Sequence, residues 1–330
     1  MLTSTNTYTY LSDPMLRSLF LPSVVTGLAI AALCSMLSVL VVLKRLAFIG
    51  QGVSHAAFGG VGLAAAMGLL AAGASGGAAV GLLQFGVIFA FCLGAALLIG
   101  YLSEKGETEA DTAIGIVLVA SMGFGAVLIH RARTGVAWET FLFGSITAVG
   151  WFDAIVGVGV AAAVTLTLWA LRRPLIFWAF DPGVARAVGV NERAMTLVLM
   201  TLLALATVTA MKLAGVVLAT AMLVLPGAIA LRLSKRAGVV MTLSALASLL
   251  GVVGGIIVSF EADWPTGPAI VCVLSGLFLV AWSAKTISDR ARLSMPIALP
   301  LGLLASGAGV MLVWMGVLLL MRLVRVLLPS

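Results

Sequence analysis

Apolar residues fill most of the chain in runs of about 20, and short polar intervals separate the runs. A run of this length predicts a transmembrane helix, because it spans the hydrocarbon core of a bilayer. The longest apolar tract, 194–233, is interrupted only by Lys212. A lysine at the bilayer centre costs about 2.5–3.5 kcal/mol, so Lys212 is expected to mark a turn between two spans. The expected fold class is therefore all-α, a polytopic transmembrane helix bundle. The pattern indicates nine or ten spans, at 18–43, 46–71, 78–100, 112–130, 147–171, 194–211, 214–233, 238–259, 267–284 and 296–321.

Composition supports this expectation and excludes two other classes of protein. Of 330 residues, 62% are apolar and 9% are charged, whereas charged residues make up about a quarter of a soluble domain. Disordered chains need low hydrophobicity and high charge. The polar intervals are also too short for a separate catalytic domain, which needs about 50 residues. Function is therefore expected within the bilayer or at its faces, with membrane lipid as a partner.

Small residues and cysteines refine this interpretation. Glycine is abundant, with 37 residues, which suits closely packed membrane helices. Cys34, Cys92 and Cys272 lie in apolar runs and form no CxxC pair, so they are expected to be buried free thiols. Residues 1–17 have no basic region before an apolar core and are not expected to be a cleavable signal peptide.

The distribution of Lys and Arg predicts the orientation of the bundle, because cytoplasmic connections carry the excess of these residues. One alternate set of connections, which includes Lys44, Arg45 and the interval 172–193, holds 13 of the 19 basic residues. The opposite set, which includes Arg131 and Lys212, holds six. The first set is therefore expected in the cytoplasm, with both termini outside.

Motifs of the common enzyme classes are missing from the sequence. It contains no GxxxxGK[ST] loop for nucleotide phosphates and no HExxH zinc motif. Its GxSxG match, at 73–77, lies in a turn between two spans rather than between a strand and a helix. No enzyme activity, covalently bound cofactor or nucleic-acid partner is therefore expected. Acids inside the spans are few, which argues against a transporter driven by an ion gradient.

The most informative polar residues inside a span are Gln51 and His55. With the helix starting at Leu46, His55 lies about 14 Å deep, near the middle of a hydrocarbon core about 30 Å thick. Gln51 is four residues earlier and shares a helix face with His55. An imidazole nitrogen is a good ligand for Mn, Fe or Zn, and an amide oxygen adds a weaker contact. A metal contact is the favoured hypothesis. A histidine that hydrogen bonds to a neighbouring helix is the alternative.

The interval 172–193 contains the signals of a short helix at the cytoplasmic face. Asp181 followed by Pro182 is typical of a helix start, because the carboxylate caps the helix and proline fits its first position. Gly189 is a natural stop. Such a helix either binds a partner or simply connects two spans.

Two other features have mainly structural interpretations. Pro226 and Gly227 predict a bend or break in the span 214–233, since proline removes a backbone hydrogen bond. His130 ends a span beside Arg131 and is expected to be an interfacial residue.

In these stretches the chain resembles the membrane subunits of ABC-type metal-ion importers, the manganese/zinc/iron permease family. The resemblance rests on the order, spacing and membrane placement of several short motifs rather than on any one of them. The motifs are KR…GQGVSH (44–55), DTAIGI (111–116), FLFGSI (141–146), FD…A…GV (180–190), LVLPGA (223–228) and PTGP (265–268).

The resemblance implies a fold similar to that of the vitamin B12 and siderophore importers. It implies a homo- or heterodimer of permease chains in a bacterial inner membrane, coupled to cytoplasmic ATPase subunits and supplied by an extracytoplasmic metal-binding protein. The substrate would be a divalent transition-metal ion (Mn, Zn or Fe), in contact with His55 and Gln51. The short cytoplasmic helix would contact the ATPase through Asp181, Pro182, Gly183, Ala185, Arg186 and Gly189.

The chain departs from the family pattern in two places. Gln51 stands where the family usually has an aspartate, so one formal negative charge is missing from the implied metal path. Residues 291–330 add a basic linker and a further span to the transport domain expected at 1–290. Two alternatives stay open. One is a permease for a metal chelate such as haem or a siderophore, and the other is a secondary transporter that works without an ATPase.

Overall fold

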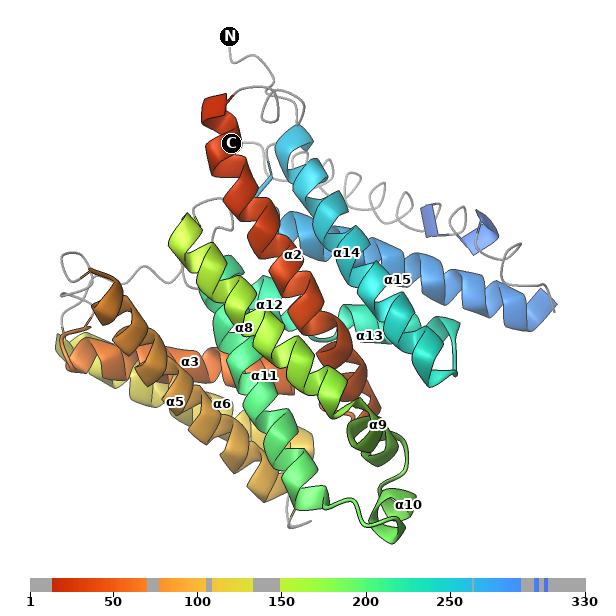
Figure 1. Cartoon of the computed structure of the whole chain (residues 1–330), viewed down its shortest axis with the longest axis horizontal. Helices are drawn as coiled ribbons and strands as arrows, with labels where there is room; N and C mark the ends of the chain where they lie inside the picture. The colour runs from red at the N-terminus through yellow and green to blue at the C-terminus, as the bar shows by residue number, and fades with distance from the viewer. Residues whose placement is uncertain are drawn as a thin grey trace, which may run out of the picture.

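The computed structural model of the protein describes residues 14–69, 77–104, 109–132, 149–262, 264–291, 300–302 and 306–307. Across these ranges the regular secondary structure is helical, which confirms the all-α fold class. Figure 1 shows most of the helices inclined across one bundle. They are α2 (Pro14–Leu43), α3 (Ile49–Ala66), α5 (Gly77–Glu104), α6 (Ala110–Ala132), α8 (Trp151–Ala170), α9 (Arg172–Phe180), α10 (Pro182–Ala187), α11 (Glu192–Ala214), α12 (Val216–Met222), α13 (Leu225–Leu233), α14 (Ala237–Ala262) and α15 (Thr266–Ala291).

Eight helical segments in the described ranges are long and apolar enough to cross a membrane. Each of them overlaps one of the spans expected from the sequence. This agreement has a simple cause, since the length of an apolar run is a local property of the chain. The segments are Leu21–Leu43, Ala79–Ser103, Ala110–Ala132, Trp151–Ala170, Glu192–Ala214, Val216–Leu233, Ala237–Glu261 and Thr266–Arg290.

The second expected span, 46–71, is α3, which is shorter than predicted. It begins at Ile49 rather than at Leu46, because the preceding residues form a hydrogen-bonded turn that ends α2. In this turn the Leu46 N–H donates to the carbonyl oxygen of Val41 over 2.9 Å. Helix α3 is not among the eight segments above, and it contains Gln51, His55 and several glycines.

The tract 194–233 divides close to Lys212, as predicted. Helix α11 ends at Ala214, and Gly215 follows with a φ of +88°. A residue with a side chain rarely adopts this backbone conformation, so glycine is the residue that allows the turn. The expected break at Pro226 is also present, since α12 ends at Met222 and α13 begins at Leu225.

Helix α2 runs through the bundle and packs against α8, α13 and α14. Leu33, Leu37 and Leu40 of α2 are almost completely buried. Between α2 and α14, the buried Ser244 hydroxyl donates a 2.6 Å hydrogen bond to the carbonyl oxygen of Ser35. Hydrogen bonds of this kind hold membrane helices together where polar groups have no water to bind.

The connections of the chain gather at two ends of the bundle. At one end, the ammonium of Lys44 lies over the ring of Trp178, which joins the end of α2 to α9. In Figure 1, α9 and α10 lie at this end, close to the start of α11. Elsewhere, Lys212 of α11 pairs with Asp153 of α8. The contact between Lys44 and Trp178 joins connections that we expect in the cytoplasm. The pair of Lys212 and Asp153 joins connections that we expect outside.

The last expected span, 296–321, lies largely outside the described residues. At 300–302 the chain lies against α15, because the Ser283 hydroxyl donates to the carbonyl oxygen of Gly302 over 2.9 Å. A Cβ added to Gly302 would lie 2.6 Å from the backbone nitrogen of Ala284. The division into a transport domain at 1–290 and an additional segment at 291–330 stays a prediction.

Candidate functional site

Gln51 and His55 lie one helical turn apart near the start of α3, on the same face of the helix. The Gln51 side chain is exposed and that of His55 is half-buried. Because α3 begins at Ile49, His55 lies about 9 Å along the helix from its first residue, not the 14 Å expected from a start at Leu46. The two side chains expected to contact a metal are therefore both accessible on α3.

The hydrogen bonds of α3 determine which ring nitrogen of His55 is available to a ligand. The Nδ1 atom lies 3.0 Å from the backbone carbonyl oxygen of Gln51. A carbonyl oxygen only accepts hydrogen bonds, so Nδ1 carries the proton and Nε2 keeps its lone pair. The Ser54 hydroxyl donates to the same carbonyl over 3.1 Å. This arrangement is typical of a metal-binding histidine, whose second nitrogen is held by a backbone oxygen.

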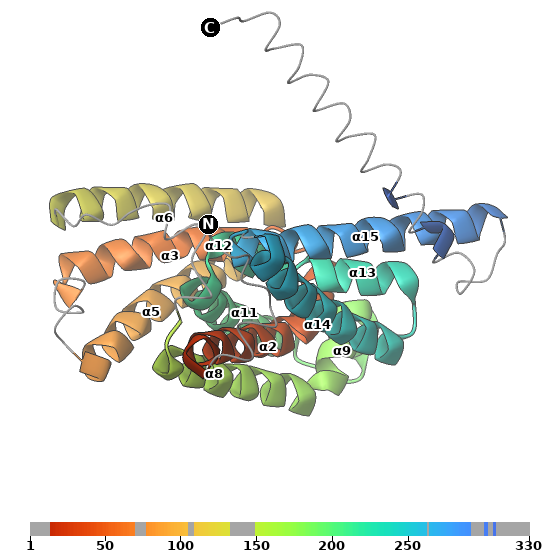
Figure 2. The ribbon, with the colours of Figure 1, turned by 90° about the horizontal axis from the view of Figure 1, so that it is seen from above.

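Helix α3 packs tightly on both α5 and α6, and Figure 2 shows α3 lying between these two helices. A Cβ added to Gly62 would lie 2.8 Å from the carbonyl oxygen of Gly125 in α6. A Cβ added to Gly60 would lie 2.9 Å from the Cα atom of Ile88 in α5. Glycine therefore permits nearly direct backbone contact. This packing holds α3 in place while His55 stays accessible.

The break between α12 and α13 lies next to the start of α3. A Cβ added to Gly50 would lie 3.1 Å from a methyl carbon of Leu223 and 3.9 Å from the Cα atom of Thr220. Pro226 has no N–H, so the carbonyl group of Met222 lacks its usual helical donor. Broken membrane helices of this kind frequently line ion pathways in transporters.

Helix α10 begins and ends as the sequence predicted. The Asp181 carboxylate accepts a 3.0 Å hydrogen bond from the backbone N–H of Val184, and Pro182 occupies the first position of the helix. At the other end, Gly189 has a φ of +86°, and the N–H of Val190 donates to the carbonyl oxygen of Ala185 over 2.9 Å. This pattern is a Schellman motif, which needs glycine in the left-handed conformation.

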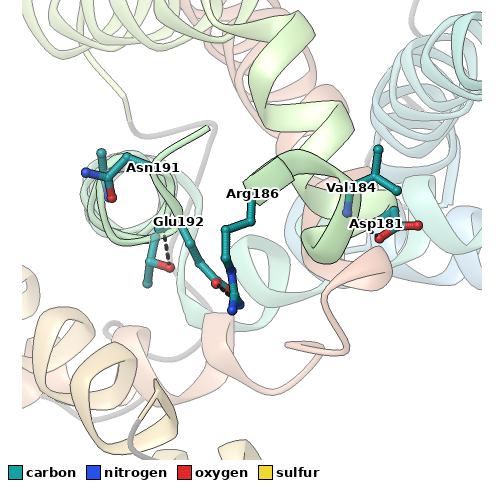
Figure 3. Close-up of polar contacts among 7 residues, drawn as sticks. Asp181, Val184, Arg186, Asn191 and Glu192 are labelled. Atoms are coloured by element: carbon teal, nitrogen blue, oxygen red, sulfur yellow. Dashed lines mark hydrogen bonds and ion pairs between the residues drawn. The ribbon is translucent and has the colours of Figure 1, made fainter. Parts of the chain in front are cut away.

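The side chains of α10 divide between the protein interior and its surface. Ala185 is buried against neighbouring residues, whereas Gly183 and Arg186 are exposed. Figure 3 shows Arg186 pointing from α10 toward Glu192 at the start of α11. The Arg186 guanidinium donates a 2.6 Å hydrogen bond to the Glu192 carboxylate. Of the six residues expected to contact an ATPase, five lie in α10 or at its N-cap, and Gly189 directly follows the C-cap residue Val188.

Two charge contacts were not expected from the sequence. Lys212 was interpreted only as the marker of a turn, yet it donates a 3.0 Å hydrogen bond to the Asp153 carboxylate. Lys44 was interpreted only as a cytoplasmic anchor, yet its Nζ atom lies 3.5 Å from the centroid of the Trp178 ring. The sequence could have indicated that Asp153 is paired, because charged residues are scarce in the spans and an acidic side chain near a bilayer usually has a partner.

The remaining candidates give a mixed result. Cys34 and Cys92 are buried as expected, but Cys272 is exposed on α15, so the prediction for this thiol was wrong. Its apolar surroundings in the sequence are equally compatible with a lipid-facing position. His130 lies exposed in the last turn of α6. Among the described residues, no three His, Cys, Asp or Glu side chains form a group that could hold a metal ion.

Comparison with known proteins finds related membrane transport proteins. The model of the ABC 3 transport family matches residues 17–285. The manganese transport system membrane protein MntC of Halalkalibacterium halodurans is 34% identical over 276 residues, which cover 83% of this chain and 90% of the relative. The manganese transport system membrane protein MntB of Synechocystis sp. is 32% identical over 274 residues, which cover 82% of this chain and 85% of the relative.

A solved structure has the same fold. PsaBC from Streptococcus pneumoniae, determined in complex with a Fab, superposes with a TM-score of 0.66 and 28% sequence identity. The match covers 82% of this chain and 92% of that chain. Together with the family match over most of the sequence, this identifies the chain as a member of the ABC 3 transport family.

Proposed function

We propose that this chain is the membrane permease subunit of an ATP-driven importer of divalent transition-metal ions in a bacterial inner membrane. The observation that carries the proposal is the arrangement of Gln51 and His55 on α3, which presents a free imidazole Nε2 and an amide on one accessible face. Family membership supports it, since MntC and MntB are manganese transport proteins by name. The metal is the transported substrate, not a resident cofactor.

The chemistry of the two side chains suits a transported ion. Imidazole nitrogen binds Mn, Fe and Zn, while a neutral amide oxygen binds them more weakly than a carboxylate does. His55 and Gln51 supply two donors, whereas these ions take about four to six. A second permease chain and water would supply the others. Weak, incomplete coordination lets an ion enter and leave, which a transport path requires.

Helix α10 suits contact with a cytoplasmic ATPase. Its exposed surface includes Val184, which is 46% exposed, and Val188 at its C-cap, which is 63% exposed. Both residues lie outside the membrane spans, where an apolar side chain gains free energy by packing against a partner. The N-cap Asp181 and Gly189, which follows the C-cap, hold this short helix in a defined shape. ATP hydrolysis is assigned to the partner chain.

The proposed mechanism is alternating access. An extracytoplasmic binding protein delivers the ion, which passes His55 and Gln51 between two permease chains. ATP binding and hydrolysis in the partner subunits then move α10 and reorient the bundle. The break at Pro226, beside the start of α3, provides a place where the helices can change their angle.

The test is transport by the complete complex in vesicles. The chain is co-expressed with an ABC ATPase and a metal-binding protein from the same organism, and the complex is purified, reconstituted and supplied with radioactive manganese. We expect ATP-dependent uptake that free Mn²⁺, Fe²⁺ or Zn²⁺ reduces by competition. Uptake that persists without ATP would indicate a secondary transporter, and competition only by haem or a siderophore would indicate a chelate permease.

A further inference from the structure

Helices α3 and α6 lie side by side (Figure 2), and the contacts of two glycines show that they run in the same direction. A Cβ added to Gly52 would lie 2.7 Å from a methyl carbon of Ile114. A Cβ added to Gly59 would lie 3.0 Å from the carbonyl oxygen of Ser121. Both residue numbers rise together from the first pair to the second, so the two helices are parallel and keep one register.

This register places Asp111 of α6 close to the level of Gln51 on α3. Asp111 is three residues before Ile114, and Gln51 is one residue before Gly52. At 1.5 Å per residue, the two residues are therefore about 3 Å apart along the common direction of the helices. Asp111 is the second residue of α6 and lies on the side of Gln51 that we expect to be nearer the cytoplasm.

Both side chains lie on the side of the helix pair that faces away from α5. Gly60 packs against the backbone of α5, and Gln51, nine residues earlier, lies about 180° around α3 from it. Phe124 stacks on an aromatic ring of α5, and Asp111, thirteen residues earlier, lies about 140° around α6 from it. Asp111 and Gln51 are also both exposed. They are therefore neighbours on one accessible surface, formed by α3 and α6.

The carboxylate of Asp111 has a chemical property that the two side chains on α3 lack. An imidazole and an amide bind through neutral atoms, whereas a divalent ion carries two positive charges. A carboxylate is a charged, hard oxygen ligand, which Mn²⁺ favours. Within the part of the chain that the structure describes, the Asp111 carboxylate forms no ion pair. Its charge is therefore available to a passing cation.

We propose that Asp111 is a further substrate contact, whose carboxylate receives the metal ion from His55 and Gln51 on its way to the cytoplasm. The proposal rests on the proposed function and deepens it by naming the charged ligand of the path. One nitrogen and two oxygen donors, from two adjacent helices of the same chain, then follow one another along the path. The charge of Asp111 attracts the ion past the weaker, neutral amide of Gln51.

The experiment measures the manganese concentration that gives half-maximal uptake by the reconstituted complex. Asp111→Asn keeps the shape of the side chain and removes its charge, so we expect this concentration to rise about tenfold. Manganese binding to the detergent-solubilised complex is expected to weaken by a similar factor. Assembly with the ATPase should be unchanged, because substitution of an exposed side chain leaves the packing of the helices intact.

Two further variants distinguish a metal contact from a structural role. Gln51→Asp places a carboxylate on the neighbouring helix and is expected to restore most of the affinity that Asp111→Asn loses. A carboxylate with a structural role on α6 would not be replaced in this way. Glu109→Gln is the matched control, because it removes the same charge from an exposed residue directly before α6. We expect it to leave uptake unchanged.

Three results would overturn the role of Asp111. They are uptake by Asp111→Asn equal to that of the parent, a loss that Gln51→Asp does not restore, and an equal loss in Glu109→Gln. Should Asp111→Asn fail to assemble, Asp111→Ser takes its place, since it also removes the carboxylate. If the proposed function is wrong, His55→Ala also retains uptake. If only the role of Asp111 is wrong, His55→Ala still loses it.

Discussion

The Nδ1 atom of His55 lies 3.0 Å from the backbone carbonyl oxygen of Gln51, so the two residues expected at the metal are also joined to each other. This hydrogen bond holds the imidazole with Nε2 directed away from the helix backbone. The backbone of Gln51 thus orients the ring, while its side chain carries the neutral oxygen that we propose contacts the metal. Substitutions at the two positions therefore test different properties of the site.

Replacement of His55 removes the stronger of the two proposed metal donors. We expect His55→Ala to lower manganese uptake at least about tenfold, as loss of metal-site residues commonly does. Assembly with the ATPase should be unchanged, because the side chain is only half-buried. The control is His130→Ala, which removes the other histidine of the chain from an exposed position on α6. Equal uptake by the two variants would leave His55 with a structural role.

Replacement of Gln51 tests the effect of charge at the site. We expect Gln51→Asp to bind Mn²⁺ more tightly, because a carboxylate is a harder and charged oxygen ligand. The matched control is Gln51→Asn, which has nearly the same shape as aspartate but stays neutral. The measurement is competition among Mn²⁺, Fe²⁺ and Zn²⁺ for uptake by the two variants. Identical competition profiles would place residue 51 off the metal path.

The ion pair between Asp153 and Lys212 joins α8 to α11. Both side chains are partly exposed, at 39% and 42%, so solvent weakens their attraction and the expected coupling energy is at most about 1 kcal/mol. We expect Lys212→Met and Asp153→Asn each to lower the melting temperature slightly. The double variant should lose less than the sum of the two. Strictly additive losses, measured by thermal unfolding in detergent, would contradict the pairing.

The contact between Gly62 and Gly125 holds α3 against α6. Gly62→Ala places a Cβ 2.8 Å from a backbone oxygen, which only a shift of the helices relieves, so we expect a loss of about 1–3 kcal/mol in unfolding free energy. Gly123→Ala on α6 is the control, since a Cβ there has no neighbour within 4 Å. Alanine favours a helix over glycine by up to about 1 kcal/mol, so this variant is expected to be neutral or stabilised.

The cap of α10 links local stability to transport. Asp181→Ala removes the acceptor for the Val184 N–H and is expected to destabilise α10 by about 1 kcal/mol, reducing metal-stimulated ATP hydrolysis by the complex. Asp181→Asn keeps a cap of similar strength without the charge and is expected to behave like the parent protein. A defect of equal size in both variants would mean that the charge of Asp181, rather than capping, matters.

Local features of the chain were predictable because they depend on neighbouring residues. The caps of α10 follow from Asp181 and Gly189, and the break before α13 follows from Pro226. The common face of Gln51 and His55 follows from the pitch of any α-helix. The starting point of α3 was less predictable, because Arg45 takes a left-handed turn that its residue type does not favour.

The sequence by itself determined that this protein is a helical membrane bundle, because apolar length and helical periodicity are local properties. Only the tertiary structure decided which distant groups meet. Asp153 and Lys212 are 59 residues apart in the chain, and Lys44 contacts Trp178 from another helix. Such pairs depend on how helices pack against one another, and the contacts of glycines such as Gly62 set that packing.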